Sequence, residues 1–356
     1  MTTPSLSAVD AVTPAFDHAR RALLQPFRFA LWWRLSLVGL LSGEFVSGGG
    51  GGGTNWQVPA QRRGNEDLIG YFAEPDFSRI MEFLPLILFL VAVLIVLGIV
   101  MLYISSVFRF ILLETVLHDR CEIGAGWNRW QRQGWSYFLW QLGFNLAVLL
   151  MMGLVVGLAL AVAAATGALS APREHVALLV AGGVVLFFVL MAMLLVNLVI
   201  WLFTKDFVVP MMALDDVGAV EGWRRLLPLL SADKGGYAVY VIMKAILAVG
   251  AALVFGIAQL IVTLILLVPV GLVAAGAILG GKAAGLTWNA ATIALAVVVG
   301  TVLLLLLIWL WALISVPAVF FFQSYTLRFF GGRYARLGAL MGPVPPPIPV
   351  VPAAGV

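Results

Sequence analysis

About six stretches of the chain, each 20 or more residues long, are almost purely apolar. The clearest of them, residues 84–103, contains no charged side chain. A helix of about 20 apolar residues matches the ~30 Å hydrocarbon core of a bilayer. Because hydrophobic residues make up 62% of the chain and charged residues only 11%, no water-soluble fold could bury them all. Continuous runs rather than short alternating segments exclude a barrel. The sequence therefore predicts an all-α, polytopic transmembrane helical bundle.

We expect six spans, and we expect the fifth apolar run to be interrupted. A single helix over residues 237–280 would be ~66 Å long, about twice the hydrocarbon thickness. Pro269 and Gly271 are predicted to break it, which leaves 270–281 as a re-entrant or interfacial segment too short to cross. Residues 1–18 are polar and show no cleavable signal peptide, so the first span is expected to be an uncleaved anchor. The expected spans are 29–46, 84–108, 137–165, 176–203, 237–267 and 290–322.

Three parts are predicted along the chain: an N-terminal segment with an amphipathic helix (1–28), the transmembrane domain (29–328) and a Pro-rich, extended tail (329–356). Fifteen lysines and arginines fall on the side that holds both termini, against five on the other side. This bias predicts cytoplasmic termini and residence in a bacterial inner membrane. The outer loop, 47–82, begins with six glycines that are typical of flexible coil. No Gly-Lys-Ser/Thr follows them, so a phosphate-binding loop is not indicated.

An internal repeat is indicated by two ungapped alignments of the chain with itself. A shift of 96 aligns Arg109 with Lys205, Asp119 with Asp215, Gly126-Trp127 with Gly222-Trp223, and Arg129 with Arg225. A shift of 204 aligns Asp17 with Glu221 and Arg20-Arg21 with Arg224-Arg225. Each copy comes just before an odd-numbered span, which predicts three repeats of one interfacial helix followed by two transmembrane helices.

These basic helices carry tryptophan and are typical of segments that lie in the lipid headgroup layer. They are interpreted either as ordinary positive-inside anchors or as a cytoplasmic collar that binds a protein partner or anionic lipid. The candidate binding residues are Arg20, Arg21, Trp127, Arg129, Trp223, Arg224 and Arg225.

No catalytic signature is present. His18, His118 and His175 all lie outside the predicted spans, so a Ser–His site within the membrane is not indicated. There is no His-Glu-x-x-His, no span with two aspartates, and a single cysteine. Asp206 stands beside Lys205, which favours an ion pair at the membrane interface. We therefore expect no enzyme, no metal, no cofactor and no nucleic-acid partner.

Polar residues inside the spans suggest a second class of function. The candidates for a polar pathway are Asn145, Asn197, Lys244 and Gln259. Asn and Gln in bundles more often join helices through hydrogen bonds. Lys244 is different, because a buried lysine needs a carboxylate, and Glu114 or Asp206 would be nearest in depth. The sequence thus predicts a non-enzymatic scaffold, anchor or accessory subunit of a membrane complex, with a transporter or channel-like protein for a small or lipidic substrate as the alternative.

The chain also resembles an uncharacterised bacterial family of six-span membrane proteins with a glycine-rich first outer loop. The resemblance rests on Arg20-Arg21, Pro26-Phe27-Arg28, Trp32-Trp33 and the glycine run, on Phe108-Arg109-Phe110 through Glu114 to Trp127, and on Asp206-Phe207, Pro210-Met211 and Trp223. A more distant likeness is to the non-catalytic membrane domain of some glycerophosphodiester phosphodiesterases. The resemblance implies six helices in a membrane and no catalytic residue.

Overall fold

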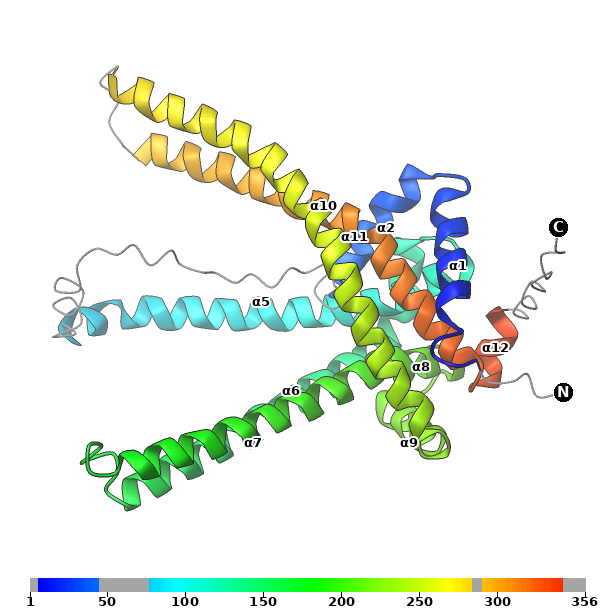
Figure 1. Ribbon diagram of the computed structural model, residues 1–356. Helices are drawn as coiled ribbons and strands as arrows, with labels where there is room; N and C mark the ends of the chain where they lie inside the picture. Colours follow the sequence, from blue (N-terminus) through cyan, green and yellow to red (C-terminus); the bar gives the residue numbers. More distant parts are fainter. Residues whose placement is uncertain (1–5, 45–76, 284–289, 342–356) are drawn as a thin grey trace, which may run out of the picture. The chain divides into compact units, whose positions relative to one another are not determined.

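The computed structural model describes residues 6–44, 77–283 and 290–341, and over these ranges the chain is helical, with no strand (Figure 1). The predicted all-α class is confirmed. The expected glycine run and residues 342–356 of the expected tail lie outside the described residues, whereas residues 329–341 of that tail are mostly helical, with Phe329, Phe330 and Leu337 buried. The helices are α1 (Val12–Leu24), α2 (Phe29–Leu41), α5 (Phe77–His118), α6 (Ile123–Ala165), α7 (Val176–Phe203), a π-helix η1 (Thr204–Val208), α8 (Val209–Asp215), α9 (Ala219–Ala232), α10 (Lys234–Ala283), α11 (Ala290–Gly331) and α12 (Ala335–Met341).

Five of the described helices are long and apolar enough to cross a membrane. The most apolar 18-residue windows of the first three contain no buried residue, and leucines such as Leu154 and Leu158 stand exposed. So much exposed apolar surface is stable only where lipid covers it. The chain is therefore an integral membrane protein. The five segments are Phe83–His118, Ile123–Ala165, Val176–Asp215, Lys234–Gly276 and Thr292–Gly331.

The first expected span is shorter than the sequence suggests. Helix α2 covers Phe29–Leu41, which is 13 residues. At 1.5 Å per residue it is ~20 Å long, less than the ~30 Å of the hydrocarbon core. Six spans therefore stay a prediction, while five are described.

The expected break at Pro269 is wrong. Helix α10 runs without interruption through Pro269 to Ala283, over 50 residues. In water, proline usually ends a helix because it lacks an N–H and clashes with the preceding turn. In a membrane, no water is present to satisfy an opened backbone, so the helix continues through the proline. The separate re-entrant segment over 270–281 is therefore not formed.

The chain divides into two compact units. Unit 1 comprises residues 1–35, 106–246 and 320–356, and unit 2 comprises 36–105 and 247–319. Unit 1 has an aromatic core in which the ring of Phe207 contacts those of Tyr237, Tyr240 and Phe330. Within this unit α6 and α7 lie side by side as a long hairpin (Figure 1).

Unit 2 is joined by polar contacts between apolar helices. The Gln259 side-chain amide of α10 donates to Ser315 Oγ of α11 at 3.0 Å, and the Trp311 indole N–H donates to Thr263 Oγ1 at 2.9 Å. These pairs hold the outer parts of α10 and α11 side by side (Figure 1). Polar side chains that bond across helices in this way stabilise packing where the hydrophobic effect does not.

Two similar turns precede α6 and α9. Helix α5 is followed by Asp119 and helix α8 by Asp216, both with φ of 54°. A short aspartate side chain tolerates this left-handed conformation better than most residues do. The helices that follow begin at Ile123 and Ala219, which are 96 residues apart, the same shift as in the sequence alignment.

Candidate functional site

A buried ion pair lies between η1 and α10. Lys244 Nζ is 2.5 Å from Asp206 Oδ2, and the two side chains are 11% and 1% exposed. Asp206 was one of the two carboxylates expected for Lys244 from its depth. The other, Glu114, binds Arg129 instead. The interfacial pair expected between Asp206 and Lys205 is thus replaced by a contact with a more distant lysine.

Hydroxyl groups complete the surroundings of this pair. Tyr240 donates its O–H to Asp206 Oδ2 at 2.8 Å, and Lys244 Nζ is 3.3 Å from the same phenol oxygen and 3.4 Å from Thr326 Oγ1. Asp206 Oδ1 is buried and has no hydrogen-bond partner among the described residues. The cluster links η1, α10 and α11, and it leaves one carboxylate oxygen unsatisfied, which is a costly arrangement in an apolar core.

The π-helix places Asp206 in this core. All five residues of η1 are buried, and the segment continues directly into α8 through Val209. A π-turn inserts one extra residue per turn and rotates the following side chains, and such bulges are frequent at functional sites. Sequence analysis gave no signal for this bulge.

A second group of buried cations surrounds Trp201. Arg109 donates from Nη1 to the Tyr137 hydroxyl at 2.7 Å, and its Cζ is 5.6 Å from the Trp201 ring centroid. Lys205 Nζ lies 5.1 Å from the same centroid. Cation–π contact partly replaces the water that these charges lose on burial. The two cations that the shift of 96 aligns therefore meet at one aromatic ring.

The proposed polar pathway residues occupy separate places. Lys244 belongs to the ion-pair cluster, and Gln259 bonds Ser315 in unit 2. Asn145 is exposed on α6, and Asn197 is half-buried on α7. Gln259 belongs to unit 2 and the other three to unit 1, where the hydrogen bonds of Lys244 go to Asp206, Tyr240 and Thr326 rather than to either asparagine.

Helices α1 and α9 each bury one row of small and apolar residues inside the protein. Helix α1 buries Ala15, Ala19 and Leu23, while Arg20 and Arg21 are exposed. Helix α9 behaves in the same way, since Ala219, Gly222 and Leu226 are buried. Part of each apolar side thus completes a protein core, while other apolar residues, such as Phe27 and Leu227, stay exposed, so contact with the headgroup layer stays a prediction. The arginines are exposed together with Phe16 and Leu24 of α1 and Val220 and Leu227 of α9.

The candidate residues of the second and third copies are held by acidic partners and aromatic rings. Arg129 bonds Glu114, and Arg225 Nη1 bonds Asp215 Oδ2 at 2.7 Å. The Asp215 and Glu221 carboxylates raise the pKa of the Arg225 guanidinium. Arg224 is 78% exposed, and within the described part of the chain its ion pair is with Glu221, one turn away. The rings are half-buried, with Trp127 beside Phe108 and Trp223 beside Trp140.

One histidine joins three distant segments. His18 Nε2 is 3.3 Å from Asp119 Oδ1, and His18 Nδ1 is 3.0 Å from Ser324 Oγ. The Ser–His–Asp arrangement resembles a hydrolase triad, but Ser324 is fully buried within α11, about two turns before its end. The neighbouring backbone N–H groups there are used within the helix, so they cannot stabilise an oxyanion. We interpret the contact as a clasp for α1. The sequence could not show it, because the three residues are far apart.

Within the described ranges, no group of three or more His, Cys, Asp or Glu side chains is placed to hold a metal ion. Comparison with protein families gives a match over residues 6–340 to a family of unknown function, DUF7544. The chain belongs to DUF7544. No curated protein and no solved structure matches it.

The residues matched by the DUF7544 family include every site described above. The matched range includes the clasp residue His18, the Asp206–Lys244 pair and the arginines of α9. An unknown-function family assigns no activity to them. The likeness to the membrane domain of glycerophosphodiester phosphodiesterases stays an expectation from the sequence.

Proposed function

We propose that the protein is a non-enzymatic scaffold or accessory subunit of a membrane complex, and that it binds a partner protein through the exposed arginines of α1 and α9. The observation that carries this proposal is that α9 buries residues on one side and exposes an arginine on the other. Ala219, Gly222 and Leu226 are buried, whereas the Arg224 side chain is 78% exposed. Arg224 pairs with Glu221 of its own helix, and its exposed guanidinium keeps further N–H donors, so it is suited to contact an acidic surface.

The proposal is tested by affinity purification of the full-length protein from its membrane in mild detergent. We expect a stoichiometric partner that is lost in Arg224→Glu. Arg225 is left unchanged, because its bond to Asp215 serves the fold. The matched control is Arg173→Glu, an exposed arginine in the connection between α6 and α7.

Loss of the partner in both variants would show a nonspecific charge effect and would contradict the proposal. So would a monodisperse wild-type protein with neither a partner nor a preference for anionic lipid. Capture of anionic phospholipid alone, lost in Arg224→Glu, would replace the protein partner by the lipid surface.

We further propose that this arginine-rich side faces the cytoplasm of a bacterial inner membrane. Two exposed serines make a matched pair of probes. Ser231→Cys lies near the end of α9, and Ser170→Cys lies in the connection between α6 and α7. Both are introduced with Cys121→Ser, although Cys121 is buried and burial raises the pKa of its thiol. In intact spheroplasts an impermeant maleimide should label residue 170, and should label residue 231 only after permeabilisation. The reverse pattern would invert the topology.

Transport of a small or lipidic substrate is the second candidate. It is favoured by one observation, the ion pair of Lys244 and Asp206 within apolar spans, since buried charges there often mark ion pathways. Proteoliposomes loaded with a pH-sensitive dye would test one form of it. Proton flux that disappears in the double variant Asp206→Asn with Lys244→Met, while its thermal unfolding shows that it is folded, would support transport. Equal flux in both proteins would contradict it.

A further inference from the structure

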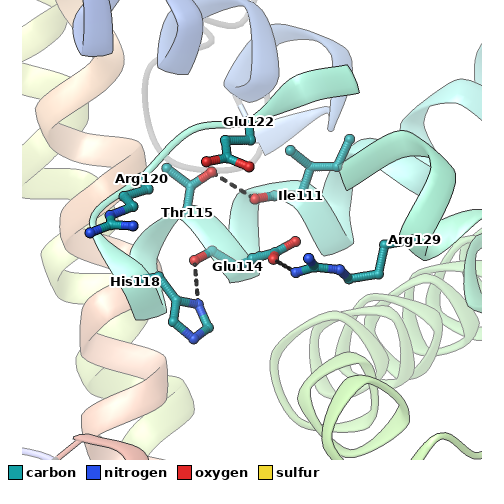
Figure 2. A pocket seen from close by; sticks show the side chains of 7 residues that line it. All are labelled: Ile111, Glu114, Thr115, His118, Arg120, Glu122 and Arg129. Atoms are coloured by element: carbon teal, nitrogen blue, oxygen red, sulfur yellow. Dashed lines mark hydrogen bonds and ion pairs between the residues drawn. The ribbon is translucent and has the colours of Figure 1, made fainter. Parts of the chain in front are cut away.

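A small pocket opens at the turn between α5 and α6 (Figure 2). Its volume is about 210 Å³, and one side is open. Pockets for whole drug-sized ligands usually hold about 300–1,000 Å³. This pocket therefore suits a small polar group, or the polar end of a larger molecule. It is lined by Ile111, Glu114, Thr115, His118, Arg120, Glu122 and Arg129.

The lining carries both signs of charge in equal number. In Figure 2, Arg120 and Arg129 lie on opposite sides, with Glu114 and Glu122 between them. With His118 neutral, the formal charge of the lining is zero. A simple anion would be repelled by the carboxylates and a simple cation by the guanidinium groups. A zwitterion, which carries both charges a few ångströms apart, matches such a lining.

Two of the four charges are available to a ligand, and a third is partly available. Both Glu114 oxygens are used, by Arg129 and by the Trp130 indole N–H at 2.6 Å. Arg129 is 60% exposed and keeps further N–H donors. Arg120 and Glu122 are exposed, and neither side chain makes a hydrogen bond to another residue of the described chain. A ligand can therefore take an anion site at the arginines and a cation site at Glu122.

The pocket also lies near the membrane surface of unit 1. Trp135 is exposed on α6, six residues after Arg129, and exposed tryptophan is typical of the membrane interface. Six helical residues rise ~9 Å, close to the ~5–8 Å thickness of one headgroup layer. Beyond it, Leu139 and Leu146 are exposed along α6. Acyl chains could lie along this apolar surface while the headgroup enters the pocket.

We propose that the pocket binds a phosphate ester that carries a primary ammonium, as in the headgroup of phosphatidylethanolamine. The phosphate lies on Arg120 and Arg129, and the ammonium lies on Glu122. This inference rests on one part of the proposed function: the turn between α5 and α6 must lie at the level of the lipid headgroups. It uses none of the α1 and α9 arginines proposed to bind a partner, so the two can fail independently.

The test is native mass spectrometry of the full-length protein with added phosphatidylethanolamine, phosphatidylcholine or phosphatidylglycerol. We expect wild type to bind phosphatidylethanolamine about tenfold more tightly than either other lipid, because only this lipid offers N–H donors to a carboxylate. In Glu122→Gln the lining becomes net positive, and the preference should shift to phosphatidylglycerol. In Arg120→Gln all three lipids should bind more weakly.

Arg132→Gln is the matched control, since Arg132 is exposed on α6 and does not line the pocket. Equal binding of the three lipids by wild type would overturn the proposal. So would an unchanged preference in Glu122→Gln, or the same loss in Arg132→Gln as in Arg120→Gln. Displacement of the lipid by free phosphoethanolamine at matched concentration would support the same recognition of phosphate and ammonium, and would identify the ligand as a soluble molecule. Equal thermal unfolding of all variants shows that the fold is intact.

Discussion

Removing one partner of the buried ion pair should destabilise the protein strongly. In Lys244→Met the Asp206 carboxylate keeps only the Tyr240 hydroxyl on one oxygen, and the other oxygen has no partner among the described residues. The two side chains are 11% and 1% exposed, so water screens the charge little. We expect a loss of about 3–5 kcal/mol in the free energy of unfolding, a large part of a typical total of about 5–15 kcal/mol. Asp206→Asn should cost a similar amount, because it strands the ammonium group.

The double variant Asp206→Asn with Lys244→Met removes both charges and should lose less than either single variant. The two effects should therefore be non-additive by at least about 2 kcal/mol. Denaturant unfolding of the detergent-solubilised protein measures all four members of the cycle. Two single variants that each lose less than about 1 kcal/mol, and whose losses simply add, would refute the buried ion pair as a stabilising contact.

Two further perturbations follow from local geometry. In Gly222→Ala the new Cβ would lie 2.8 Å from Val208 Cγ1, and thermal unfolding should show a loss of about 1–3 kcal/mol, whereas Gly153→Ala, which points into open space, should be neutral or slightly stabilising. Hydrogen bonds from Arg333 lower the pKa of the Asp233 carboxyl. Its stabilising effect is thus present above the ordinary aspartate pKa of about 3.9 and is lost as the pH falls through the lowered value. Asp233→Asn should flatten the acid limb of a stability–pH curve, and an unchanged curve would contradict this.

Hydrophobicity predicts the spans well because a membrane imposes one length and one polarity on each of them. The five long helices all fall on apolar runs visible in the sequence. The errors arise where a residue acts differently in lipid and in water. Pro269 was expected to end a helix, yet α10 continues through it, because an interrupted backbone has no water to bond in a bilayer. The first predicted span fails for another reason. Helix α2, which contains Arg34, is only 13 residues long and is too short to cross the hydrocarbon core.

The candidate site could be predicted only in part. The depth of Lys244 in its span implied a carboxylate partner and reduced the choice to Glu114 and Asp206. Sequence could not choose between them, because the choice depends on the π-turn that buries Asp206 and on Arg129, which binds Glu114. The apolar faces of the basic helices posed a similar problem. An amphipathic pattern shows that Leu226 needs cover, but it does not tell whether lipid or protein supplies it.

The two turns that precede α6 and α9 each contact a segment near one end of the matched region. In the proposed repeat, Asp119 aligns with Asp215. Asp119 contacts His18 of α1. Asp215 accepts a hydrogen bond from the hydroxyl of Tyr334, just before α12, at 2.6 Å, and another from Nη1 of Arg336, in α12, at 2.5 Å. The two acidic turns are thus closed by segments from near opposite ends of the described chain. The matched region, 6–340, includes both closing segments. If the turns are equivalent, removing either terminal segment should expose a similar acidic surface, and both segments belong to the folding unit rather than to its linkers.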